Sequence, residues 1–125
     1  MKKNSLDVFG QLLMKYVRDE TVSTWDRMID GQLKGLTAQE VSKKTSDLSE
    51  EQLEVIKWMT PKIIDEGLHN LLFMFEECEE LFLGLAKEKG RYEDIKEKSD
   101  GLSGELYTED GWIKRFSKER HNEID

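Results

Sequence analysis

Residues 53–85 read LEVIKWMTPKIIDEGLHNLLFMFEECEELFLGL and contain the longest apolar stripe of the chain. Apolar side chains recur there at every third or fourth position, which is the spacing of one face of an α-helix. Within residues 68–75 only His69 and Asn70 are polar, so this part is expected to be buried on several sides. The pattern predicts one long central helix around which the rest of the chain packs.

The two ends of this helix carry their own signals. Ser49 and Gln52 have the spacing of a capping box, which places the start directly ahead of the stripe. Gly90, which follows two lysines, is typical of a helix C-terminus. Pro61 lacks a backbone N–H and clashes with the preceding turn, so a kink or break is expected near residues 59–60.

Three further segments are assigned from their patterns. Residues 5–33 show helical spacing, and a β-branched patch at 21–24 leaves open whether they form one kinked helix or two consecutive helices. Residues 37–44 predict a short helix with a capping box that starts at Thr37. Residues 91–107 are polar and weakly periodic, and a loop is expected there.

The C-terminal residues allow more than one interpretation. Residues 106–116 fit either a β-hairpin that turns at Asp110-Gly111 or a helix capped by Thr108, and the helix is the preferred interpretation. For residues 118–125 the sequence leaves open whether the tail is disordered.

These segments predict an all-α fold, in which a small bundle of four to five helices surrounds a long, Pro-kinked central helix and ends in a less regular C-terminal segment. A length of 125 residues fits a single domain that spans the whole chain. Apolar and charged residues each make up 37% of the chain, but the three Trp, five Phe and three Tyr argue against disorder.

The charge of the chain limits the kinds of partner it can have. The formal net charge is −8, and −7 of this lies after residue 60. Such a chain lacks the clustered Lys and Arg that bind nucleic acid, and anionic lipid surfaces would repel it. The negative charge remains compatible with binding to a basic protein or to a cation, or it serves only to keep the protein soluble. With one cysteine, no signal peptide and no apolar run long enough for a membrane span, a cytoplasmic location is expected.

One candidate site consists of Asp65, Glu66 and His69. Glu66 and His69 have the Glu-x-x-His spacing of carboxylate-bridged metal sites in helical bundles, so these three residues could bind a divalent metal ion. A dinuclear site needs a second such motif, and the other histidine, His121, does not provide one. The alternative is an Asp65–His69 hydrogen bond at the edge of the core.

A second candidate site could bind a protein partner. Its members are Glu76, Glu77, Glu79, Glu80 and Trp112. The four glutamates spread around more than one helical turn, so they form either a solvated helix face or a docking patch for a basic protein. Trp112, like Trp25 and Trp58, is either part of the core or an exposed interface anchor.

No enzyme signature is present in the sequence. It contains no Gly-rich phosphate loop, no Gly-x-Ser-x-Gly and no His-Glu-x-x-His, so we expect a protein that is not an enzyme and has no cofactor. Small size, acidity and helical character are similar to those of bacterial immunity proteins, which neutralise basic nuclease toxins. This resemblance implies a non-catalytic binding protein that engages a basic partner. The alternatives are a metal-binding helical bundle and a homodimer formed through Phe73, Phe75 and Leu83.

Overall fold

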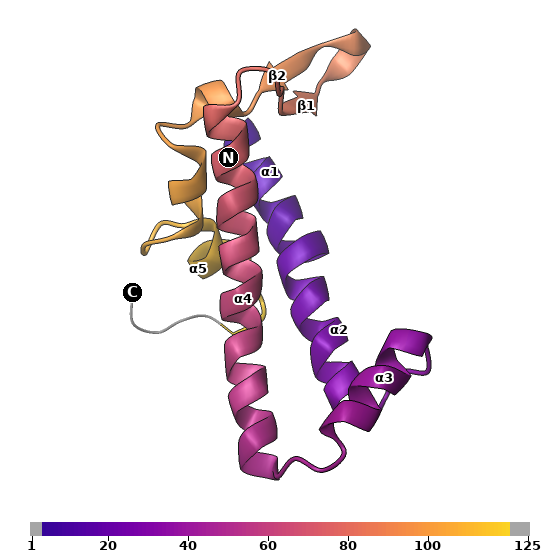
Figure 1. The fold of residues 1–125 in the computed structure, drawn as a ribbon. Helices are drawn as coiled ribbons and strands as arrows, with labels where there is room; N and C mark the ends of the chain where they lie inside the picture. Colours follow the sequence, from indigo (N-terminus) through magenta and orange to yellow (C-terminus); the bar gives the residue numbers. More distant parts are fainter. Residues whose placement is uncertain (1–3, 121–125) are drawn as a thin grey trace.

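Two long antiparallel helices form the frame of the protein in the computed structural model, which describes residues 4–120 (Figure 1). The first helix runs without interruption through a π-helical segment, and the second is joined to it by a short helix at one end of the molecule. Their bounds are α1 (Ser5–Leu13), the π-helix η1 (Met14–Asp19), α2 (Glu20–Ile29), α3 (Leu36–Thr45) and α4 (Glu50–Glu77). The mostly helical fold is confirmed, whereas the bundle of four to five helices stays a prediction.

The helix starts follow local hydrogen bonding. Ser49 and Gln52 form the predicted capping box, with the Gln52 N–H donating to the Ser49 hydroxyl over 3.2 Å and the Ser49 N–H donating to the Gln52 side chain over 2.9 Å. The capping box predicted at Thr37 is wrong, because α3 already begins at Leu36 after Gly35 and has no side-chain cap. A glycine in extended conformation is a tolerated alternative to a capping side chain.

Pro61 lies inside α4 without interrupting it. The predicted break at residues 59–60 is therefore wrong, and a kink there stays a prediction. Proline cannot donate to the carbonyl four residues earlier, which belongs to Lys57. That carbonyl instead accepts a hydrogen bond of 2.8 Å from Nη2 of Arg120. A side chain from the C-terminal segment thus replaces the missing helical donor.

Helix α4 ends at Glu77 and not near Gly90 as predicted. Carboxylates crowd the negative end of the helix dipole there, and no cation lies in the last turn, so continuation of the helix is disfavoured. The chain instead forms a small antiparallel hairpin of β1 (Gly84–Ala86) and β2 (Tyr92–Asp94). Lys89 and Gly90 both have positive φ and make its turn.

The C-terminal segment is more ordered than the sequence predicts. Residues 91–107 were expected to form a loop, but they contain β2 and the 3₁₀ helices η3 (Lys96–Lys98) and η4 (Leu102–Leu106). The preferred helix is found in α5 (Trp112–Phe116), although Gly111 and not Thr108 precedes it. Residues 118–120 are held by hydrogen bonds, and residues 121–125 of the expected tail lie outside the described residues.

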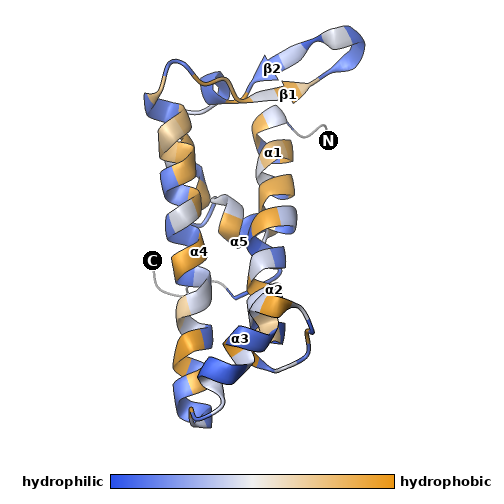
Figure 2. Ribbon diagram, turned by 45° about the vertical axis from the view of Figure 1, so that its right-hand side comes forward, coloured by the Kyte–Doolittle hydropathy of each residue, from blue (hydrophilic) through white to orange (hydrophobic). Residues whose placement is uncertain are grey.

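The core lies where this segment bridges the two long helices. Helix η4 packs on α4, and α5 packs on α1 and η1. The buried cluster comprises Leu13, Met14, Leu68, Leu72, Ile95, Leu102, Leu106, Trp112 and Ile113. The indole of Trp112 lies so close to the backbone of α1 that a Cβ atom at position 10 would overlap it, which explains Gly10. Hydropathy colouring shows that apolar positions also occur along α4 well away from this cluster (Figure 2).

Candidate functional site

The polar centre of the molecule is Arg18, whose side chain is completely buried in η1. Its Nε and Nη2 atoms donate to the two carboxylate oxygens of Asp65 on α4 over 2.6 and 3.1 Å. The remaining donors reach the C-terminal segment, with Nη1 bonded to the Ser117 hydroxyl and Nη2 bonded to the Arg120 carbonyl, each over 2.7 Å. A buried charge persists when it is paired and hydrogen-bonded in this way.

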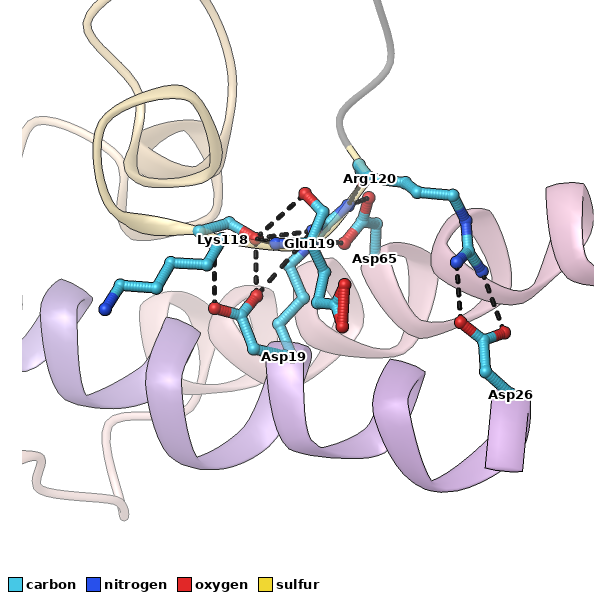
Figure 3. A network of polar contacts seen from close by, with 8 residues as sticks. Asp19, Asp26, Asp65, Lys118, Glu119 and Arg120 are labelled. Atoms are coloured by element: carbon cyan, nitrogen blue, oxygen red, sulfur yellow. Dashed lines mark hydrogen bonds and ion pairs between the residues drawn. The ribbon is translucent and has the colours of Figure 1, made fainter. Parts of the chain in front are cut away.

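Residues 117–120 continue this network along the first helix. Figure 3 shows Lys118, Glu119 and Arg120 lying beside Asp19 and Asp26 of that helix. Asp19 accepts from the Ser117 hydroxyl and from the Lys118 N–H. The Arg120 guanidinium makes a two-point contact with Asp26, over 2.6 and 3.2 Å, which raises its pKa.

This network has a structural role. Its side chains hold one another, and the Arg18 guanidinium has no exposed surface from which to reach a substrate. Sequence analysis did not single out Arg18, yet a signal was available. Met14, Arg18 and Val22 follow one another at four-residue intervals on the buried side of the first helix, so an arginine occupies a position in an apolar stripe. Because arginine is almost never fully buried unless it is paired, an arginine in such a position predicts a buried carboxylate partner.

The structure does not bring the three predicted metal ligands together. Asp65 is buried and paired with Arg18, whereas Glu66 is exposed. Within residues 4–120 no group of three His, Cys, Asp or Glu side chains is arranged to hold a metal ion. Metal binding by these residues stays a prediction that the described contacts do not support.

His69 lies at the edge of the core among aromatic rings. Its imidazole stacks on Phe73, with a centroid distance of 6.4 Å, and lies 5.8 Å from the ring of Tyr107. The Nδ1 atom is buried and has no hydrogen-bond partner among the described residues. The predicted hydrogen bond between His69 and Asp65 is therefore wrong, because Asp65 is taken by Arg18.

The glutamates of the predicted partner site separate into two groups. Glu76 is half-buried and accepts a hydrogen bond from the backbone N–H of Ser103 in η4. Hydrogen bonds from the hydroxyl and the backbone of Ser103 hold the pKa of Glu76 below its ordinary value. This residue joins α4 to the C-terminal segment, and its part in partner binding stays a prediction.

The other three glutamates are exposed, and none of their side chains has a hydrogen bond or ion pair within residues 4–120. We call them, together with their exposed apolar neighbours, the acidic end patch. It comprises Phe73, Glu77, Glu79, Glu80, Leu81 and Phe82. Phe73 is 46% exposed and Phe82 is 60% exposed, so apolar and negative surface lie close together where α4 ends.

Trp112 does not belong to this surface. Its side chain is completely buried in the core and packs edge-on against Phe9 with a centroid distance of 5.7 Å. Its assignment to partner binding is therefore wrong. The sequence left both interpretations of Trp112 open, because it does not show which other segments cover this residue.

The predicted dimer surface is also mostly covered, because Phe75 and Leu83 pack against the core cluster while Phe73 remains exposed.

None of the helices in residues 4–120 combines the length and apolarity that a membrane span requires.

Searches with the whole chain against protein-family models, curated proteins and solved structures gave no match.

Proposed function

We propose that this protein is a non-catalytic binding protein that engages a basic protein partner through the acidic end patch. The observation that carries the proposal is the position of three carboxylates, unpaired within residues 4–120, beside exposed Leu81 and Phe82 at the end of a 28-residue helix.

The carboxylates are placed where they cost stability. The C-terminus of a helix carries partial negative charge, and a carboxylate there is unfavourable by about 0.3–1 kcal/mol. Glu77, Glu79 and Glu80 also repel one another, and the last turn of α4 contains no basic residue. Lysine and arginine side chains of a partner would relieve both effects.

The apolar part of the patch supports a protein as the partner. Interfaces combine apolar anchors with a polar rim, and aromatic side chains are enriched among the residues that dominate binding energy. Phe73 and Phe82 serve as the anchors in this proposal, and the glutamates direct the approach of a positively charged surface.

The test uses charge reversal in the full-length chain. The E77K/E79K/E80K variant should lose a partner that the wild-type protein captures from a native lysate of its source cells. Increasing salt should release this partner from the wild-type protein, because salt screens the attraction between solvent-exposed charges. Mass spectrometry should identify the partner as a basic protein.

The matched control is E40K/D47K/E109K, which changes the net charge equally at exposed positions elsewhere. This control should still capture the partner. If the end-patch variant captures the same proteins as the wild type, or if the captured protein is acidic and resists salt, the proposal is wrong.

A further inference from the structure

A second exposed stripe runs along α4, separate from the acidic end patch. It consists of Glu51, Val55, Met59, Ile63 and Glu66, and we call it the outer stripe. Successive members are four, four, four and three residues apart, so they line up along one side of the helix. The buried residues of this part of α4, Thr60, Pro61 and Asp65, lie on the other side.

The middle of the outer stripe is apolar and open to solvent. Val55 is 55% exposed, Met59 is 38% exposed and Ile63 is 66% exposed. Trp58 lies beside them and is 61% exposed, with the ammonium of Lys62 4.8 Å from its ring centroid. Single exposed apolar residues are normal, but four within residues 55–63 of one helix make a patch of the kind that marks an interaction surface.

The charges at the two ends of the outer stripe indicate what covers it. Glu51 and Glu66 are exposed, and their side chains have no hydrogen bond or ion pair among the residues that the structure describes. If two copies paired in parallel along this stripe, each glutamate would face its own counterpart. If they paired antiparallel about Met59, Glu51 of one copy would face Glu66 of the other. Either self-pairing therefore places like charges opposite each other, which is destabilising.

We infer that the outer stripe is a docking surface for an amphipathic helix of a partner protein, apolar in its middle and basic at both ends. Helices recognise one another through anchors at such three- and four-residue spacings. Glu51 and Glu66 are fifteen residues apart, which corresponds to about 22 Å along the helix, so the partner's cations should have a similar separation.

The probe is a synthetic, fluorescently labelled helical peptide with leucines at four-residue spacing and a lysine at each end, about 22 Å apart when helical. A second peptide has glutamates in place of the lysines. Anisotropy titrations with the full-length protein should give saturable binding of the lysine peptide and at least about tenfold weaker binding of the glutamate peptide. The E51K/E66K variant should reverse this preference.

Single substitutions locate the binding surface. I63D and W58A should each weaken binding of the lysine peptide by about tenfold or more, since buried aromatic and apolar anchors dominate such interfaces. The matched control is L36D on α3, where Leu36 is 76% exposed, and it should bind as the wild type does. The E77K/E79K/E80K variant should also bind the lysine peptide normally, which separates this inference from the function proposed above. Circular dichroism should show that every variant is folded.

Three results would overturn the inference: no saturable binding of the lysine peptide, equal binding of both peptides, or unchanged binding by both I63D and W58A. Sedimentation provides an independent measurement. A concentration-dependent dimer that I63D abolishes would assign the outer stripe to a second copy of the chain, whereas a monomer at all concentrations agrees with the inference.

Discussion

Glu76 illustrates, at the scale of a single residue, how neighbouring glutamates acquire different roles. Glu76 and Glu77 are adjacent in the sequence, but only Glu76 points toward η4 and meets Ser103. Its carboxylate holds a part of the chain that lies 27 residues away. Glu77 is exposed and belongs to the acidic end patch.

The lowered pKa of Glu76 predicts how acid affects stability. Because the hydrogen bonds from Ser103 hold the folded-state pKa below the ordinary value of 4.5, Glu76 binds a proton less readily in the folded chain than in the unfolded chain. Its contribution to stability is therefore present above the ordinary value and is lost as the pH falls through the lower folded-state pKa.

Urea unfolding at a series of pH values between about 6 and 3 should show this effect. The wild-type protein should be more stable than E76Q at pH 6, and the difference should shrink toward pH 3. E77Q is the control, because the Glu77 side chain accepts no hydrogen bond within residues 4–120. The difference in free energy of unfolding between E77Q and the wild type should change less with pH. A difference for E76Q that does not depend on pH would contradict the assigned cause.

Pro61 lies, at the scale of an element, beside one of the points where the C-terminal segment attaches to α4. A proline inside a helix costs about 3 kcal/mol relative to alanine, and it leaves one carbonyl without its helical partner. In this protein that carbonyl, at Lys57, accepts from Arg120. The carbonyl that the proline leaves without a helical donor is thus an attachment point for the C-terminal segment.

A double-mutant cycle tests this link. In P61A the new backbone N–H can donate to the Lys57 carbonyl, so removing the Arg120 side chain should cost less than it does in the wild type. We expect a coupling energy of about 0.5–1.5 kcal/mol from urea unfolding of the wild type, P61A, R120A and the double variant.

G67A is the matched control background for the cycle. It also raises helix propensity in α4, and a Cβ atom at position 67 would meet nothing within 4 Å. Truncating Arg120 should cost the same in G67A as in the wild type. Additive effects of P61A and R120A, within about 0.3 kcal/mol, would show that the two residues are not linked.

Arg18 connects, at the scale of the whole molecule, three parts of the chain that are far apart in the sequence. Its partners Asp65 and Ser117 lie 47 and 99 positions away. Together with the Trp112 core, this network fixes the C-terminal segment against both long helices. The surfaces proposed for binding lie on the outside of the frame that the network holds together.

Replacing Arg18 should therefore destabilise the whole protein. R18M leaves Asp65 buried without its partner, and we expect a loss of about 3–5 kcal/mol in the free energy of unfolding. The double variant R18M/D65L removes both charges and should recover much of this loss. Urea unfolding followed by circular dichroism measures both effects.

Arg27 supplies the control for this prediction, because it is exposed on the same long helix. R27M should change the free energy of unfolding by no more than about 0.5 kcal/mol. A cost of R18M as small as that of R27M would contradict the central role of the buried network.

The sequence by itself determined the features that depend on near neighbours. The capping box at Ser49 and the helical spacing of residues 53–77 follow from side chains within a few positions of one another. The excess of negative charge after residue 60 is likewise a property of composition alone. Local patterns decide these features because backbone hydrogen bonds in a helix join residues only four positions apart.

Only the tertiary structure decided which polar and aromatic residues are buried. Asp65 is paired with Arg18, Trp112 is in the core and Glu76 is bonded to Ser103, whereas Trp58 and Ile63 face solvent. Each outcome depends on which distant segment comes to lie against α4. Periodicity shows that a helix has an apolar face. The residues that cover this face come from segments that are distant in the sequence, so local patterns do not identify them. On α4 the C-terminal segment covers one side and leaves the outer stripe open.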